Sequence, residues 1–84
     1  MPVILAIESS CDETAVAILR GERNQPSTVL ASEIASQIDL HRAHGGVVPE
    51  LASRNHSLHL RPLVERALRT ANLSIDAIDV FAAT

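Results

Sequence analysis

Short apolar runs alternate with polar segments along the chain in an order that predicts an α/β fold. Residues 3–7 and 15–19 are apolar without alternation, which is typical of strands covered on both faces inside a layered sheet. The polar and acidic segment between them, residues 8–14, is rich in turn-forming side chains, so residues 3–19 are predicted to form a β-hairpin. Its loop is expected to be exposed at one end of a buried sheet.

A third strand is predicted over residues 27–34, after a polar turn that contains both Gly and Pro. We expect it to be an edge strand that pairs with the second strand. Val29 and Ala31 would share one of its faces, whereas Ser32 and Glu33 would be more exposed.

An irregular loop over residues 41–48 and a long helix over residues 49–71 are expected next. Pro49 suits the first turn of this helix because its missing N–H is no loss there, and the Glu50 carboxylate complements the positive end of the helix dipole. A short turn and a fourth strand over residues 80–84 complete a β-β-β-α-β order. Because the sequence ends as that strand begins, we expect the front part of a larger domain.

The predicted helix carries two apolar faces. The broad one contains Leu60, Leu63, Val64, Ala67, Leu68 and Ala71. Leu51 and Leu58 fall nearly opposite, so the helix would need two packing neighbours. Alternatively, Pro62 kinks the axis, because an interior proline removes a backbone hydrogen bond, and the two halves turn different faces to one sheet. We favour the two-neighbour interpretation.

Composition narrows the class of protein. With 84 residues the chain is one domain or part of one, and with Phe81 as its one aromatic residue the core must be built from Ala, Val, Ile and Leu. The formal net charge of −3 comes without a basic cluster, so composition alone does not predict nucleic-acid binding. The single Cys11 excludes an internal disulfide, and the first apolar run is too short for a signal peptide or membrane span. A soluble, cytoplasmic protein is expected.

The hairpin loop is the first candidate for chemistry. Glu8, Asp12 and Glu13 place three carboxylates within six positions. Such a cluster can hold a divalent cation, position an amine or supply a general base, since crowding raises the pKa of at least one member. The alternative is a solvated loop whose acids only aid solubility, and the pattern alone leaves both interpretations open.

Histidines and arginines give weaker signals. Two histidine pairs have a spacing of three, His41 with His44 and His56 with His59, and neither matches a known zinc-ligand pattern. Solvated or loop-anchoring histidines are therefore expected, with no metal site in this chain. The arginines of the helix are expected to lie on an ordinary solvated face.

Two segments carry a resemblance that pattern analysis cannot supply. Residues 1–14, MPVILAIESSCDET, closely resemble the amino terminus of the tRNA N6-adenosine threonylcarbamoyltransferases, the TsaD family formerly called glycoproteases. Residues 41–56, HRAHGGVVPELASRNH, are similar to the second early motif of that family. The resemblance covers the entire chain and implies the front part of an actin- and sugar-kinase-like (ASKHA) lobe.

The resemblance also implies an activity. Members of the family transfer a threonylcarbamoyl group from threonylcarbamoyl-AMP to N6 of adenosine 37 in tRNA, which gives t6A. It implies Asp12 and Glu13 as catalytic carboxylates that orient the adenine amine and accept its proton. Ser9 and Ser10 would shape the loop beside the acyl phosphate.

The second motif contributes Arg54 and His56, which are carried over as substrate or subunit contacts. The partners implied are a smaller paralogous subunit (TsaB-like), a small ATPase (TsaE-like) and the tRNA, with no membrane and no DNA. The full-length family is expected to hold one divalent metal ion, iron or zinc. Its His-x-x-x-His ligand motif has no counterpart here, so the chain is expected to bind no cofactor and to be inactive alone.

Two alternatives to a transferase fragment remain open. One is a non-catalytic dimerisation module that resembles the smaller paralogous subunit. The other is the front half of a sugar or acetate kinase, which shares the hairpin but usually has Gly in its loop.

Overall fold

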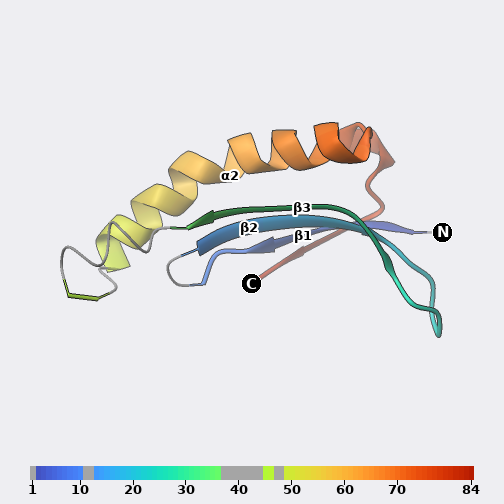
Figure 1. Ribbon diagram of the computed structural model, residues 1–84, viewed down its shortest axis with the longest axis horizontal. Coiled ribbons are helices and arrows are strands. Elements are labelled where there is room, and N and C mark those ends of the chain that lie inside the picture. The colour runs from blue at the N-terminus through green and yellow to red at the C-terminus, as the bar shows by residue number, and fades with distance from the viewer. Residues whose placement is uncertain (1, 11–12, 37–44, 47–48) are drawn as a thin grey trace.

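Figure 1 shows a computed structural model of the chain, in which one long helix lies across one face of a four-stranded sheet. The structure describes residues 2–10, 13–36, 45–46 and 49–84. Most of the loop predicted over residues 41–48 lies outside these ranges.

The sheet has the strand order β3-β2-β1-β4. Its strands are β1 (Val3–Glu8), β2 (Glu13–Arg20), β3 (Thr28–Ser36) and β4 (Val80–Ala83). β2 is antiparallel to both β1 and β3, whereas β4 is parallel to β1. This arrangement confirms the α/β fold with its β-β-β-α-β order, and β3 is an edge strand paired with β2, as the sequence predicted.

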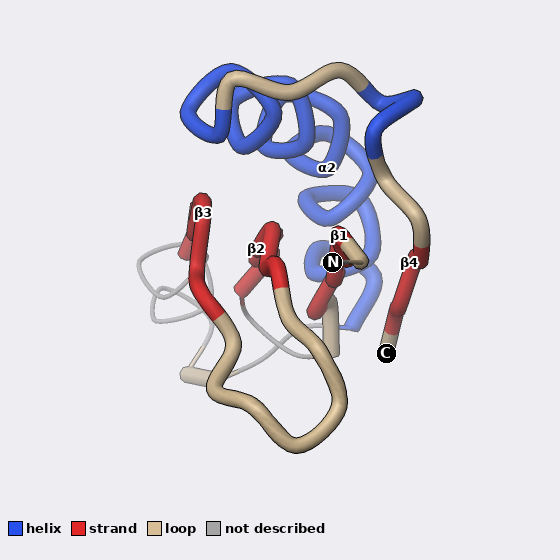
Figure 2. The backbone as a smooth tube through the Cα atoms, turned by 90° about the vertical axis from the view of Figure 1, so that its right-hand side faces the viewer, coloured by secondary structure: helices blue, strands red, loops and turns tan. Residues whose placement is uncertain are grey.

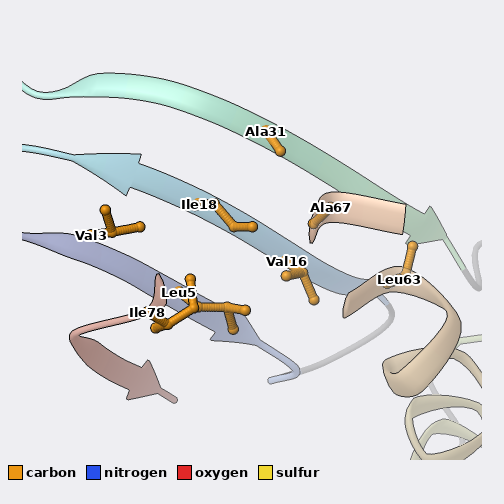
Figure 3. Packing of buried hydrophobic residues seen from close by; sticks show 8 residues of the cluster. All are labelled: Val3, Leu5, Val16, Ile18, Ala31, Leu63, Ala67 and Ile78. Atoms are coloured by element: carbon orange, nitrogen blue, oxygen red, sulfur yellow. The ribbon is translucent and has the colours of Figure 1, made fainter. Parts of the chain in front are cut away.

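The helix covers only one face of the sheet. Side chains alternate between the two faces of a strand, and the buried apolar ones of β1 and β2 lie on the helix side: Val3, Leu5, Val16 and Ile18. Figure 3 shows them together with Ala31, Leu63, Ala67 and Ile78, which complete the core. On the opposite face a shallow depression is lined mainly by small side chains, among them Ala6, Ala15, Ala17 and Ala82. The apolar runs were expected to be covered on both faces, but Figure 2 shows α2 on one side of the sheet and no other described helix or strand over the opposite side.

A bulge in β3 changes which residues face the helix. Ile18 pairs with Ala31 and Leu19 with Val29, so Leu30 is an extra residue in β3. Ala31 is buried, but Val29 is 60% exposed. The expectation that these two residues share a face is therefore wrong, because the inserted residue interrupts the two-residue alternation between them.

Glu33 lies under the helix instead of projecting into solvent. It follows Ala31 by two residues and therefore shares its face, and its side chain is only 19% exposed. The Thr70 hydroxyl donates a hydrogen bond to Glu33 Oε1 at 3.2 Å, and the Arg66 guanidinium lies 3.7 Å from Oε2. The sequence-based expectation of a more exposed Glu33 is wrong, whereas Ser32, on the opposite face, is exposed.

The helix α2 (Pro49–Ala71) packs through the broad apolar face that its periodicity predicted. Leu63 and Ala67 are buried against the sheet, and the flanking apolar side chains of the same face are partly buried. Figure 1 shows the axis bending along its length, as the interior Pro62 favours. Leu58 remains 69% exposed, so this bend does not bring it onto the sheet.

No helix in the described ranges is long and apolar enough to cross a membrane.

The helix ends at a left-handed residue and the chain then returns to the sheet. Asn72 has φ +57°, and the Leu73 N–H donates to the Leu68 carbonyl at 3.0 Å, which closes the last turn. After a 3₁₀ turn, η1 (Ile75–Ala77), Asp79 bonds Val3 twice. Its carboxylate accepts from the Val3 N–H at 2.7 Å, and its own N–H donates to the Val3 carbonyl at 2.8 Å. These bonds set β4 beside β1.

Two leucines of α2 provide a matched test of this packing. Leu63→Ala should lower the free energy of unfolding by about 2–5 kcal/mol, because it removes a buried side chain and leaves a cavity. Leu58→Ala should change it by about 0.5 kcal/mol or less, because Leu58 is exposed. Urea unfolding followed by circular dichroism measures both. Equal losses in the two variants would contradict the assignment of the buried face.

Candidate functional site

The candidate site is the loop between β1 and β2, together with the side chains that hold it. Of its acidic and polar residues, Asp12 and Cys11 lie outside the described residues. Ser9 is half-buried, whereas Glu8 and Ser10 are exposed.

Glu8 is engaged within the loop. Its Oε1 accepts a hydrogen bond from the Ser10 N–H at 2.7 Å, which closes a tight turn two residues long. Hydrogen bonds from the Ser10 side chain and backbone, supported by the Thr84 hydroxyl and the nearby His56, hold the pKa of Glu8 below its ordinary value of 4.5. A carboxylate with a lowered pKa is a weak base, so Glu8 shapes the loop better than it accepts a proton.

The end of β4 also fastens the loop. The Ser9 N–H donates to Thr84 Oγ1 at 3.3 Å, and the Thr84 N–H donates to the Ile7 carbonyl at 3.0 Å. Thr84 was not predicted from the sequence. It contacts the loop because β4 pairs in parallel with β1, and no local sequence pattern reveals that pairing.

Glu13 and Thr14 begin β2 and point in opposite directions. Glu13 is exposed, and by strand alternation its side chain lies on the face away from α2. Thr14 is fully buried on the helix side. Its alternation with Val16 and Ile18, two apolar residues of the same strand, is the signal from which this burial could have been predicted.

Thr14 joins the two motifs of the sequence. Its hydroxyl lies 2.6 Å from Nδ1 of His56, which is half-buried on α2 and 42 residues away in the chain. The structure therefore brings His56 to the base of the hairpin loop. Arg54 lies two residues earlier on α2, where its side chain is exposed.

The described residues offer no place for a metal ion. Within them, no three His, Cys, Asp or Glu side chains gather in a way that could hold one, and His41 and His44 lie outside them. The donor set of the described residues does not fit the iron or zinc that the resemblance implies for longer proteins, so no chemical step is assigned to a metal held by them.

Comparison with known proteins gives a consistent result. A sequence model of the tRNA N6-adenosine threonylcarbamoyltransferases matches residues 28–84. A protein of that name from Crocosphaera subtropica is 54% identical over 84 residues, which are 100% of this chain and 23% of the relative. Those from Kosmotoga olearia and Dichelobacter nodosus are 53% and 56% identical over 81 residues, which are 96% of this chain and 23% and 22% of each relative. The chain thus spans less than a quarter of the length of these curated relatives.

The two serines of the loop allow a test of the Glu8 environment. Ser10→Ala should raise the pKa of Glu8 toward 4.5, because it removes the hydroxyl that stabilises the carboxylate, whereas Ser9→Ala should leave it unchanged. Because folding lowers this pKa, Glu8 stabilises the fold at pH values above its unfolded pKa, and this contribution is lost as the pH falls through the folded value. NMR titration of the Glu8 side-chain carbon measures the shift. An equal shift in both variants would contradict the assigned contact.

Proposed function

This chain belongs to the tRNA N6-adenosine threonylcarbamoyltransferase family, and we propose that it supplies the acidic hairpin loop of that transferase. The supporting observation is that relatives with this name match it along its whole length. The reaction proposed is transfer of threonylcarbamoyl from threonylcarbamoyl-AMP to N6 of adenosine 37 in tRNA, in the cytoplasm.

The chemistry calls for a carboxylate that is free to act. The adenine amine is a poor nucleophile, because its lone pair is delocalised into the ring. As its nitrogen attacks the carbamoyl carbon, the bond from that carbon to the phosphate oxygen breaks, AMP leaves, and the amine loses a proton. A carboxylate that orients the amine and accepts this proton lowers the barrier.

Asp12 and Glu13 are the residues we assign to that step. Glu13 supports the assignment because it is exposed at the start of β2, on the face away from the helix. Glu8 is a poorer candidate because the Ser10 hydrogen bonds lower its pKa.

Ser9 and Ser10 act in this proposal by shaping the loop. The Ser10 N–H donates to Glu8 and the Ser9 N–H to Thr84, so both backbone donors have partners inside the chain. The Ser10 side chain also hydrogen-bonds Glu8, so the Ser9 hydroxyl is the group left to face the acyl phosphate. Arg54, exposed near the start of α2, is suited to a phosphate of the tRNA or to a partner subunit.

The remaining parts of the active site belong to the sequence that this chain does not cover. The chain spans 23% of the Crocosphaera subtropica relative, so the divalent metal, the nucleotide-binding segments and most subunit contacts are assigned to the other part. A smaller paralogous subunit and a small ATPase are the proposed partners. The 84-residue chain is not expected to catalyse the transfer alone.

A chimeric protein that contains this chain tests the proposed role of the loop. In it, residues 1–84 replace the matching segment of the full-length Crocosphaera subtropica relative. Asp12→Ala combined with Glu13→Ala should lower transfer of labelled threonylcarbamoyl to tRNA by about 10²- to 10⁴-fold, the usual contribution of a general base, without unfolding the protein.

Glu22→Ala serves as the control, because Glu22 is an exposed acid in the turn after β2. It should leave the transfer rate unchanged. Turnover that survives the double replacement in a folded chimera would refute the role of the loop.

A further inference from the structure

The hydrogen bond between Thr14 and His56 has a consequence for the active loop. We infer that His56 is a positioning residue, which holds the hairpin loop in place through the Thr14 hydroxyl and does not contact the substrate. The inference rests on the proposed function in one respect: it takes Asp12 and Glu13 to be the catalytic groups that the loop positions.

The burial of Thr14 makes the bond important. Thr14 is the one fully buried polar side chain among the described residues, and a buried hydroxyl without a partner destabilises the fold. Its partner within hydrogen-bonding distance is Nδ1 of His56, at 2.6 Å. Removing the imidazole would therefore leave the Thr14 hydroxyl buried without this partner, at the second residue of β2.

The position of His56 on α2 explains why a polar contact is used there. Leu63 and Ala67 pack the second half of the helix on the sheet, and His56 lies about two helical turns before Leu63. At that point the helix has reached the loop end of β2, where the apolar core has ended. The hydrogen bond thus joins the first half of α2 to the hairpin.

Strand alternation transmits the effect to Glu13. Thr14 faces the helix, so its neighbour Glu13 must face the other way. A bond that fixes the side chain of Thr14 therefore fixes the direction in which the Glu13 carboxylate leaves the sheet.

Opposite faces of the sheet separate His56 from Glu13. A histidine that bound the substrate beside Glu13 would have to reach that face, yet Nδ1 of His56 is directed at a residue buried under the helix. Positioning and direct contact therefore predict different behaviour when Thr14 is changed.

The test uses the full-length chimera with Thr14→Val, His56→Leu and the double variant. Each single change should lower kcat by about ten- to a hundredfold, as expected for a misplaced catalytic group, and should change the KM for tRNA by less than about twofold. The kcat of the double variant should lie within about threefold of that of the less active single variant, because both changes remove the same Thr14–His56 hydrogen bond. Thr14→Ser and His56→Asn should restore most of the activity, since each keeps a hydrogen-bonding atom in place.

A second readout does not depend on activity. Hydrogen exchange of the amides of residues 8–10 and 13–14 should become faster in Thr14→Val and in His56→Leu, and Thr14→Ser should leave its rate unchanged. His59→Leu is the matched control, a half-buried histidine one turn further along α2, and it should not change exchange in the loop.

Each alternative outcome has a distinct meaning. The inference is overturned if His56→Leu leaves loop exchange unchanged, or if it lowers activity by the same factor with and without the Thr14 hydroxyl. A raised KM with unchanged kcat would show a substrate contact instead. Activity that survives Asp12→Ala with Glu13→Ala, while His56→Leu still loosens the loop, would reject the proposed function and keep the positioning role. If His56→Leu does not fold, the comparison of His56→Asn with Thr14→Val decides.

Discussion

The packing of α2 on the hairpin is the interaction on which the other contacts depend. Ala67 is completely buried, and its small side chain lets the helix axis come close to the sheet. Leu63, one turn earlier, fills the space beside it. Because this contact fixes the height and direction of the helix, Thr70 and Arg66 can meet Glu33 on β3, and His56 can reach Thr14 on β2.

Two carboxylates in one short loop acquire different properties from their surroundings. Glu8 ends β1 and accepts hydrogen bonds from Ser10, so its charge is used to shape the turn. Glu13 starts β2 on the exposed face, where its carboxylate is open to solvent. The sequence places both in one acidic cluster, and only the backbone geometry separates the structural acid from the candidate catalytic one.

The sequence predicted the elements better than the contacts between them. Helical periodicity identified the buried face with Leu63 and Ala67, because the apolar residues that pack on the sheet recur with the 3.6-residue period of the helix. The bulge at Leu30 could not be found in this way, since an inserted residue leaves no mark on a short apolar run. A family resemblance identified the candidate loop. The contact of Thr84 with Ser9, 75 residues away in sequence, could be recognised only from the structure, which shows that β4 lies next to β1.

The parallel pairing of β1 with β4 sets an order in which the site can assemble. The hairpin of β1 and β2 is local, so it can form early, whereas contacts between distant segments form more slowly. The bond from Ser9 to Thr84 closes a loop of chain 75 residues long, after the helix has already crossed the sheet. We therefore expect the Ser9–Thr84 contact, which fastens the loop to the end of β4, to form among the last steps of folding.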